Sequence, residues 1–400
     1  MGWSTFRPVG LTFKDNRSFE GYSVITPVGG SGVYLLNHDG RVVHGWSVPG
    51  FQPGWGFLLP GGHLLARGQM AAVTYESGSA PPAGGSDILL ELDWGGQEVW
   101  RWEYEGFHHD MCRMPNGHTL ALIWEELPES IGRRITGGIS QDDIDKIRKQ
   151  DPDFLSFILQ GVGVGGRPRM TGRHADAIVE VNSAGEIVKI WHAYEHLDPE
   201  IDTICPLCPN MEWTHANSVD ITPDGRVLVS LRELSEVMMI DWPTGEIIWR
   251  FGKPVISHQH DPSMTPDGNI LIFDNGTHHP IQGRTRIVEV EPAGKRVVWQ
   301  YTPAMVFSLL SLHIGGCQRL PNGNTLICEG ESGRLFEVTP DKDICWEWNS
   351  PFVHDFKGLP NTQIFKTRRY APDGPELQGR VLGEQPYQEF NERWGLIQKT

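Results

Sequence analysis

The sequence predicts an all-β protein, a six-bladed β-propeller, because two kinds of hairpin recur along it. The first kind turns at Pro-x-Gly, as in CRMPNGHTLALI at 112–123 and SMTPDGNILIFD at 263–274. The second kind ends in tryptophan, as in VMMIDWPTGEIIWRF at 237–251. Apolar and polar residues alternate around the glycine turn in both, which is typical of β-hairpins. One hairpin of each kind supplies the four strands of a propeller blade.

The two kinds of hairpin alternate in order, which predicts one domain over residues 1–400. Pro-x-Gly hairpins lie at 57–66, 112–123, 218–231, 263–274 and 317–329. Hairpins ending in tryptophan lie at 33–46, 88–102, 177–191, 237–251, 286–301 and 334–348. The hairpin at 33–46 has no upstream partner, so we expect the segment 362–374 to complete its blade. A ring closed by N- and C-terminal strands leaves no free sheet edge.

Two insertions interrupt this order, at about 124–176 and 192–213. In the first, Ser140 as an N-cap and helical apolar spacing predict a helix over 140–159. Long connections in propellers gather at one end of the ring, so we expect a helical insertion near one mouth. The polar C-terminal tail, about 376–400, is expected to lie on the outside.

Composition excludes several classes of function. The formal net charge of −16 argues against nucleic acids and anionic membranes, which need basic surfaces. No apolar run reaches the ~18–20 residues that span a membrane, and the N-terminal segment lacks the features of a secretory signal, which predicts a cytoplasmic protein. No phosphate-binding glycine loop or dinucleotide fingerprint is present, so no nucleotide cofactor is predicted.

Histidines recur at matching places before the Pro-x-Gly turns. Those that lie six or eight positions before a turn proline are His109, His215, His258, His260 and His313. Six and eight differ by two, so alternation along a strand places all of them on one face. By the same count, His108 points the other way. In a propeller these positions converge on the central tunnel, so the sequence predicts a cluster of imidazoles there.

Three chemistries fit such a cluster. A neutral imidazole can act as a nucleophile, while other imidazoles and an arginine stabilise a transferred oxyanion. Several imidazoles can bind zinc, manganese or copper. A cationic tunnel can also bind an anion without catalysis. Arg232, near His215 and Asn217 in the sequence, favours an anionic group over a metal cation.

Four segments carry a family resemblance: the opening GLTFKD with GYSVITPVGGSGVYLLNHDGRVVHGW, then EWTHANSVDITPDGRVLVSLRE, QHDPSMTPDGNILIFDNG and GCQRLPNGNTLICEGESGRLFEVTP. They resemble the bacterial aryl-sulfate sulfotransferases, also called arylsulfotransferases, and the similarity covers roughly residues 10–375. The resemblance implies a six-bladed propeller that passes a sulfuryl group from an aryl sulfate ester to a phenol through a sulfated histidine. It implies no nucleotide sulfate donor and no required cofactor.

Carried over to this sequence, the resemblance gives each residue a role. It implies that His260 is the nucleophile and that His109 contacts the sulfate. It further implies that His215, Asn217 and Arg232 hold the sulfuryl oxygens and assist the leaving phenol.

Three further residues are expected to contact the substrate: His258, His313 and Trp55. Trp55 lies on the corresponding strand of an earlier blade, where it could stack on an aromatic substrate or pack in the core.

Two other functions remain open from the residues alone. A metal-dependent lyase or hydrolase would hold a divalent metal on the tunnel histidines, which are His109, His215, His260 and His313. A propeller without catalytic activity would bind only an anionic ligand.

A separate structural zinc site is a further alternative, on a His-x3-His and Cys-x2-Cys arrangement formed by His192, His196, Cys205 and Cys208. Without zinc, we expect these thiols to be reduced and buried.

Overall fold

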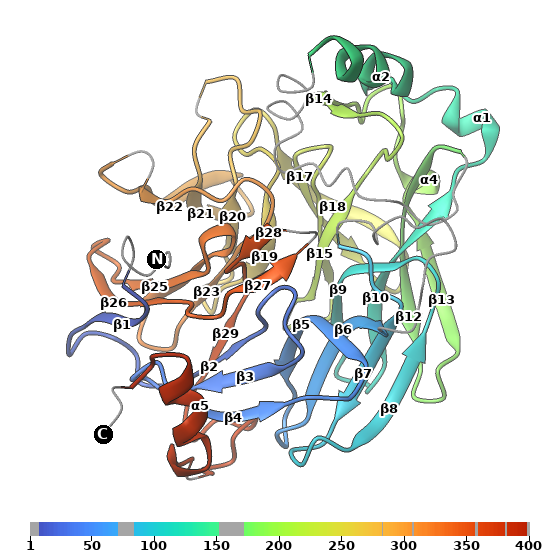
Figure 1. The fold of residues 1–400 in the computed structure, drawn as a ribbon. Helices are drawn as coiled ribbons and strands as arrows, with labels where there is room; N and C mark the ends of the chain where they lie inside the picture. Colours follow the sequence, from blue (N-terminus) through green and yellow to red (C-terminus); the bar gives the residue numbers. More distant parts are fainter. Residues whose placement is uncertain are drawn as a thin grey trace. The chain divides into compact units, whose positions relative to one another are not determined.

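The computed structural model describes residues 8–70, 84–151, 172–281, 283–305, 308–356, 359–380 and 382–397. Within these residues the protein is all-β, with six antiparallel sheets of the size of propeller blades and two small two-stranded sheets (Figure 1). The predicted fold class, a six-bladed β-propeller, is confirmed. No helix in the described part of the chain is long and apolar enough to cross a membrane.

The chain divides into two compact units, and each is described by itself. The first unit comprises Met1–Thr74, Ile88–Trp102 and Ile314–Thr400. The second unit comprises Tyr75–Asp87 and Glu103–His313. Each unit carries three of the blades.

One blade of the first unit is built from both ends of the chain. Its strands, in order, are β29 (Arg368–Tyr370), β2 (Tyr22–Ile25), β3 (Val33–Leu36) and β4 (Val42–Trp46). Tyr22 pairs with Tyr370 and Val24 pairs with Arg368. The segment 362–374 therefore supplies the missing strand, as the sequence predicts.

The other two blades of the first unit follow the predicted hairpins. One consists of β5 (Phe51–Leu58), β6 (Leu64–Met70), β7 (Ile88–Leu92) and β8 (Glu98–Glu103). The other consists of β23 (Gly316–Arg319), β24 (Thr325–Glu329), β25 (Arg334–Val338) and β26 (Ile344–Asn349), with β1 (Gly10–Lys14) added beside β26. The smaller elements are β27 (His354–Phe356), β28 (Leu359–Asn361), η3 (Gly330–Ser332), η4 (Gln385–Tyr387) and α5 (Gln388–Arg393).

The C-terminal tail is tied to the first unit by a buried asparagine. Asn391, in α5, is fully buried, and its side-chain Oδ1 accepts a hydrogen bond from the backbone N–H of Val42 at 2.9 Å. Its Nδ2 donates to the backbone oxygen of Val42, also at 2.9 Å. Val42 lies on β4, an edge strand, so Asn391 satisfies two backbone groups that no neighbouring strand bonds.

Replacing Asn391 by alanine is expected to lower the free energy of unfolding by about 1–3 kcal/mol, because both backbone groups of Val42 lose a partner. A shift of the urea midpoint would measure this effect. Gln388→Ala, which removes an exposed contact to Glu392 on the same helix, is the matched control and should leave the midpoint unchanged. Equal midpoints for the two variants would contradict the role given to Asn391.

The second unit holds three consecutive blades. The first consists of β9 (Phe107–Arg113), β10 (Thr119–Glu126), β12 (His174–Val181) and β13 (Ile187–His192). The second consists of β15 (Ala216–Ile221), β16 (Val227–Leu231), β17 (Glu236–Asp241) and β18 (Glu246–Gly252). The third consists of β19 (His260–Met264), β20 (Ile270–Asp274), β21 (Arg286–Glu291) and β22 (Arg296–Tyr301).

Tryptophan indoles join neighbouring blades, which explains the tryptophan at the end of each hairpin. Trp191 donates its Nε1–H to the oxygen of Gly245 in the turn of the next blade, at 2.9 Å. Trp249 donates in the same way to Pro292, at 2.9 Å. An indole buries a large apolar surface while its N–H finds a turn carbonyl, so one residue type serves both packing and register.

The two insertions pair with each other in the second unit. The first contains α1 (Glu129–Gly132), β11 (Gly137–Ile139) and α2 (Gln141–Gln150), and the second contains α4 (Ala193–His196) and β14 (Ile204–Pro209). β11 and β14 form a parallel two-stranded sheet, and Figure 1 shows α1, α2 and β14 gathered on one side of this unit. Ser140 caps α2 as predicted, by accepting a hydrogen bond from the backbone N–H of Asp143. Residues 152–159 of the predicted helix lie outside the described residues.

Candidate functional site

The predicted catalytic histidines lie on or beside the first strands of the three blades in the second unit. Of these strands, β15 packs against both β9 and β19. Strand pairing shifts next to His109, between Ala216 and Ser218, and between His260 and Ser263, so each first strand carries a β-bulge or irregularity. A bulge places an extra residue on one strand and turns side chains in new directions, which is why bulges are common at functional sites.

The backbone at these places is left-handed. The φ angle is 46° at His109, 48° at His215, 56° at His258 and 51° at Asp261, the residue after His260. Residues other than glycine rarely adopt this region, and each one that does lowers the stability of the fold by on the order of 1–3 kcal/mol. Strict alternation therefore fails here. The five histidines therefore do not all share the one strand face that alternation predicts, and each side chain has its own direction.

His108 lies within the cluster, and the prediction that it points away from it is wrong. The bulge of β9 leaves its buried ring stacked on Trp124, with ring centroids 4.3 Å apart. Its Nδ1 lies 2.8 Å from Nδ1 of His109, and its Nε2 lies 3.0 Å from Oδ1 of Asp176. Asp176, His108 and His109 thus form a chain of polar contacts that orients the His109 ring.

His109 is also positioned by a close approach of the backbone. Its N–H donates to the oxygen of Gly84 at 2.7 Å. Gly84 has φ 78°, and a Cβ there would lie 2.2 Å from Nε2 of His109, so only glycine fits. The His109 ring meets His215 edge to face, with centroids 4.7 Å apart. These two predicted site residues are therefore neighbours.

His215 is held by a buried carboxylate. Its Nδ1 lies 2.8 Å from Oε2 of Glu212, whose Oε1 accepts a hydrogen bond from the Trp124 indole at 2.8 Å. Burial alone would lower the pKa of His215, but the charge and hydrogen bond of Glu212 outweigh it, so the pKa is raised above its ordinary value. This environment favours the imidazolium form of His215.

His260 has the opposite environment. The Nδ2 of Asn275 donates to the oxygen of Ser311 at 2.7 Å, which turns Oδ1 of Asn275 toward Nδ1 of His260, 2.7 Å away. Because an amide oxygen only accepts, Nδ1 carries the proton and Nε2 keeps its lone pair. Burial, and next the positive charge of Arg232, hold the pKa of His260 well below its ordinary value. His260 is thus a neutral imidazole with an unprotonated Nε2.

Arg232 and Asn217 lie in the same buried region. Arg232 is 1% exposed, donates to Oε1 of Glu233 at 2.8 Å, and is close enough to His260 for its charge to lower the pKa of that histidine. Asn217 donates through Nδ2 to the oxygen of Gln259 at 2.8 Å. Its buried Oδ1 has no hydrogen-bond partner among the described residues, so it is available to a ligand that donates.

The other two substrate-contact predictions have separate outcomes. His313 is near enough to His260 for its charge to contribute to the low pKa of that histidine. Trp55 belongs to the first unit, where it is 2% exposed and Lys366 Nζ lies 4.7 Å from its ring centroid. Arg368 lies 5.8 Å from the same ring. Contact between Trp55 and a substrate stays a prediction.

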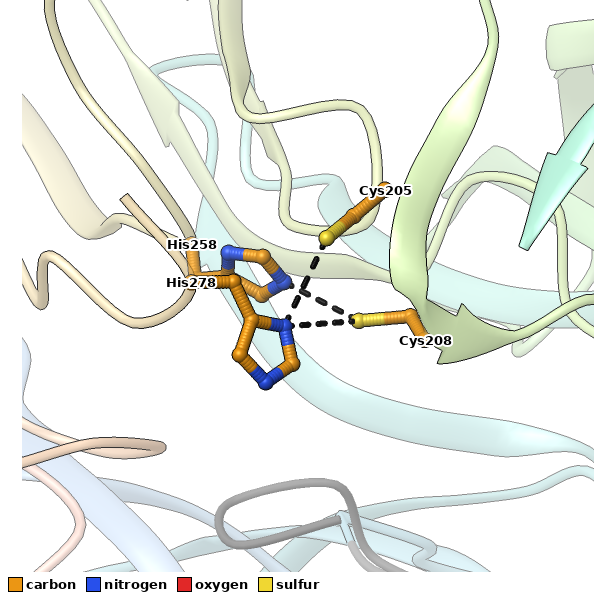
Figure 2. A group of neighbouring side chains, drawn as sticks. All are labelled: Cys205, Cys208, His258 and His278. Carbon is orange, nitrogen blue, oxygen red and sulfur yellow. Dashed lines mark hydrogen bonds between the residues drawn. The ribbon is translucent and has the colours of Figure 1, made fainter. Parts of the chain in front are cut away.

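A second cluster lies next to these residues and includes His258. Figure 2 shows the sulfur atoms of Cys205 and Cys208 directed toward the imidazoles of His258 and His278. In this cluster, a hydrogen bond with Cys208, and then those with His258 and His278, lower the pKa of Cys205, while burial raises that of Cys208. His258 therefore faces the cysteines. It precedes β19 and has a left-handed φ of 56°, which is why it does not follow His260 as the alternation predicts.

The structure also changes the predicted zinc set. His192 lies 2.6 Å from Oε2 of Glu125, and the ring of His196 stacks on Trp191 with centroids 4.7 Å apart. His192 ends β13 and His196 ends α4, apart from the cysteines that they precede in sequence. The two cysteines lie instead beside His258 and His278, and these residues form a four-residue group, Cys205, Cys208, His258 and His278.

The tunnel histidines do not form such a group. Among the described residues, the group that could hold a metal ion is Cys205, Cys208, His258 and His278, whose ligand atoms lie within 4.8 Å of one another. This group contains none of the predicted tunnel ligands, which are His109, His215, His260 and His313.

Three functional residues were missed from the sequence. Glu212 opens the segment that contains His215, and Asn275 follows Asp274 at the end of β20, so both lay inside segments already singled out for their resemblance. His278 lies in a loop next to His279. Its nearness to the cysteines depends on the fold, and no local sequence signal gives it.

Comparison with known proteins supports one family. Residues 159–351 match the model of the family described as arylsulfotransferase (ASST), which confirms the resemblance found in the sequence. None of the curated proteins matches the chain.

Similar solved structures include a protein of unknown function from Bacteroides caccae, with 14% identity, a TM-score of 0.51, and coverage of 88% of this chain and 99% of that one. A streptogramin B lyase has 10% identity, a TM-score of 0.46 and coverage of 91% and 93%. A selenomethionine-substituted virginiamycin B lyase from Staphylococcus aureus has 10% identity, a TM-score of 0.43 and coverage of 87% and 87%. At 14% identity, the likeness to the Bacteroides caccae protein concerns the fold alone.

Proposed function

We propose that this chain, whose residues 159–351 match the arylsulfotransferase family, transfers a sulfuryl group from an aryl sulfate ester to a phenol through His260. The observation that carries the proposal is the hydrogen bond from His260 Nδ1 to Asn275 Oδ1, at 2.7 Å. It leaves the Nε2 lone pair of a buried, neutral imidazole as the attacking group. The family match supports the reaction class, and the chemistry of the residues supports their roles.

The reaction balances in two steps. In the first, Nε2 of His260 attacks sulfur, an N–S bond forms, the S–O bond to the aryl group breaks, and the leaving phenolate takes a proton. In the second, the oxygen of an acceptor phenol attacks the same sulfur, the N–S bond breaks, and the proton of the phenol passes to the base. Nothing is oxidised or reduced, so the reaction needs no redox cofactor.

The residues around His260 suit the charges of these steps. The Arg232 guanidinium is buried and fixed by Glu233, so it can stabilise the negative charge on the sulfuryl oxygens without reorganising. His215, protonated beside Glu212, is the proton donor to the leaving phenolate and then the base for the acceptor. The unpartnered Oδ1 of Asn217 can accept a hydrogen bond from the acceptor hydroxyl.

Glu212→Gln tests the role of His215. Removing the carboxylate charge removes what raises the pKa of His215, so protonated His215 is lost at a lower pH than in the wild type. We expect the alkaline limb of the kcat profile to move to lower pH, and kcat at neutral pH to fall roughly 10-fold or more. A profile that keeps its alkaline limb would assign the proton donor to another residue.

A turnover assay with an aryl sulfate and a phenol tests the function itself. We expect release of the donor phenol to depend on the acceptor, with parallel lines in double-reciprocal plots, because the sulfuryl group is held by the enzyme between two half-reactions. Intersecting lines would favour direct transfer between the substrates. Absence of turnover across a panel of donors and acceptors would contradict the proposal.

A further inference from the structure

We propose that Cys205, Cys208, His258 and His278 form a binding site for one Zn²⁺ ion, which fastens the second insertion to the blade that carries His260. This inference does not depend on the proposed function. The four residues come from three places: β14, the segment before β19, and the loop after β20. A metal held by all four would cross-link parts of the chain that are about fifty to seventy residues apart.

Three of the distances between ligand atoms are close to those of a tetrahedral zinc site. Sγ of Cys208 lies 3.1 Å from Nε2 of His258 and 3.5 Å from Nδ1 of His278, and Sγ of Cys205 lies 3.4 Å from the same Nδ1. All four atoms lie within 4.8 Å of one another. Sulfur and nitrogen ligands on a tetrahedral zinc ion are about 3.6 Å apart, given ordinary Zn–S and Zn–N bond lengths.

A hydrogen-bond relay leaves the correct nitrogen of His258 free to bind. The hydroxyl of Ser257 donates to the oxygen of Thr277 at 2.6 Å, so its oxygen accepts from Nδ1 of His258 at 3.0 Å. The proton of His258 is therefore on Nδ1, and the lone pair of Nε2 points toward Cys208. Metal-binding histidines are commonly oriented by a hydrogen bond of this kind on the other ring nitrogen.

The backbone holds both histidines in place at a cost in free energy. φ is 56° at His258 and 59° at His278, in the left-handed region. The segments that carry them are tied together, because Gly276 donates its N–H to the oxygen of Ser257 at 2.9 Å. Cys205 donates its N–H to the oxygen of Glu233, also at 2.9 Å. Strained residues that are held from several sides are typical of ligand sites.

The charge and type of the ligands select the ion. Two thiolates and two neutral imidazoles favour zinc in a tetrahedral arrangement, and four protein ligands leave no open position for a substrate. Oε2 of Glu233 is buried, has no hydrogen-bond partner among the described residues, and lies 3.9 Å from Nε2 of His258. The two thiolates balance the charge of Zn²⁺, so the occupied site adds no net charge beside this carboxylate. The site is therefore structural.

Metal analysis of the purified full-length chain tests the site. We expect about one zinc ion per chain after exhaustive dialysis. Cys208→Ser and His278→Gln should each lose most of this zinc, while the matched controls Cys112→Ser and His279→Gln should keep it. His279 is the neighbour of His278 but bonds the oxygen of Pro254 instead. Chelation should lower the melting temperature of the wild type, and added Zn²⁺ should restore it.

The visible absorption of bound Co²⁺ gives a second measurement, which is made on the wild type and on a variant that keeps four ligands. Co²⁺-loaded wild type should show the visible bands of tetrahedral coordination together with thiolate charge transfer. Cys205→His should keep the visible bands and lose about half of the charge-transfer intensity, because one of the two thiolates is gone. Wild type that binds neither Zn²⁺ nor Co²⁺, zinc that both ligand variants retain, or a Cys205–Cys208 disulfide in the isolated protein would each overturn the proposal.

Discussion

Replacing His260 by alanine is expected to reduce kcat for sulfuryl transfer by on the order of 10⁴-fold, the largest effect of any single change in this protein. The change removes the attacking group, which is the Nε2 lone pair of the His260 ring that Asn275 orients. The effect should appear in kcat and in kcat/KM alike, since the bond forms only along the reaction path. Steady-state assays with an aryl sulfate and a phenol measure it.

A cavity variant separates chemistry from folding. His260→Gly removes the ring, and exogenous imidazole should restore part of the donor cleavage by acting as a diffusible nucleophile. His279→Gln, which alters a histidine outside the site, should keep wild-type kcat and KM. If His260→Ala retains more than about a tenth of wild-type kcat, the nucleophile is another residue.

Replacing Arg232 by methionine is expected to have the second largest effect. It removes the fixed positive charge that stabilises the sulfuryl oxygens, which should lower kcat by about 10²–10³-fold. It also leaves Glu233 buried without its 2.8 Å partner, which should lower the free energy of unfolding by about 3–5 kcal/mol. Turnover assays and urea denaturation measure the two effects separately.

A double variant distinguishes these two roles of Arg232. Adding Glu233→Gln to Arg232→Met neutralises the stranded carboxylate, so stability should largely return while kcat stays low. Arg232→Lys keeps a charge but loses the planar fork, so we expect activity between those of the wild type and the methionine variant. If the double variant regains activity together with stability, Arg232 serves only the fold.

Much of the fold could be predicted because its signals are local and repeated. Each hairpin carries its own alternation, its own turn glycine and, in one kind, its own tryptophan. Even the pairing of the C-terminal strand with β2 followed from counting hairpins, since one of them lacked a partner. The pairing of β11 with β14 could not be predicted in this way. It joins two irregular insertions that have no shared sequence pattern.

The site could be predicted only in part, because the backbone departs from regular strands there. Counting positions back from the proline found His109, His215 and His260, but the bulges lie between the turn and these histidines. The count therefore misplaced His108. It also misplaced His258, which precedes β19 and has a left-handed φ of 56°. A bulge depends on packing between blades, and no residue type in the sequence predicts it.

The cysteine cluster could be predicted from the sequence only for its cysteines. The Cys-x2-Cys spacing pointed correctly to Cys205 and Cys208 as close neighbours, while the nearest histidines in sequence were the wrong companions. His258 and His278 belong to the blade formed by β19, β20, β21 and β22, so their nearness to the cysteines is a property of the tertiary structure. Sequence distance is a poor guide to ligand sets in a fold where strands far apart in the chain lie side by side.

In the proposed mechanism, the sulfuryl group is bonded to Nε2 of His260 between the two half-reactions. The most direct measurement is mass spectrometry of the protein mixed with an aryl sulfate in the absence of an acceptor and quenched at alkaline pH. The account predicts a gain of one sulfonate group, mapped to the peptide containing His260, which disappears when a phenol is added before quenching. Donor cleavage without any sulfonated protein, or a sulfonate on a different residue, would contradict it.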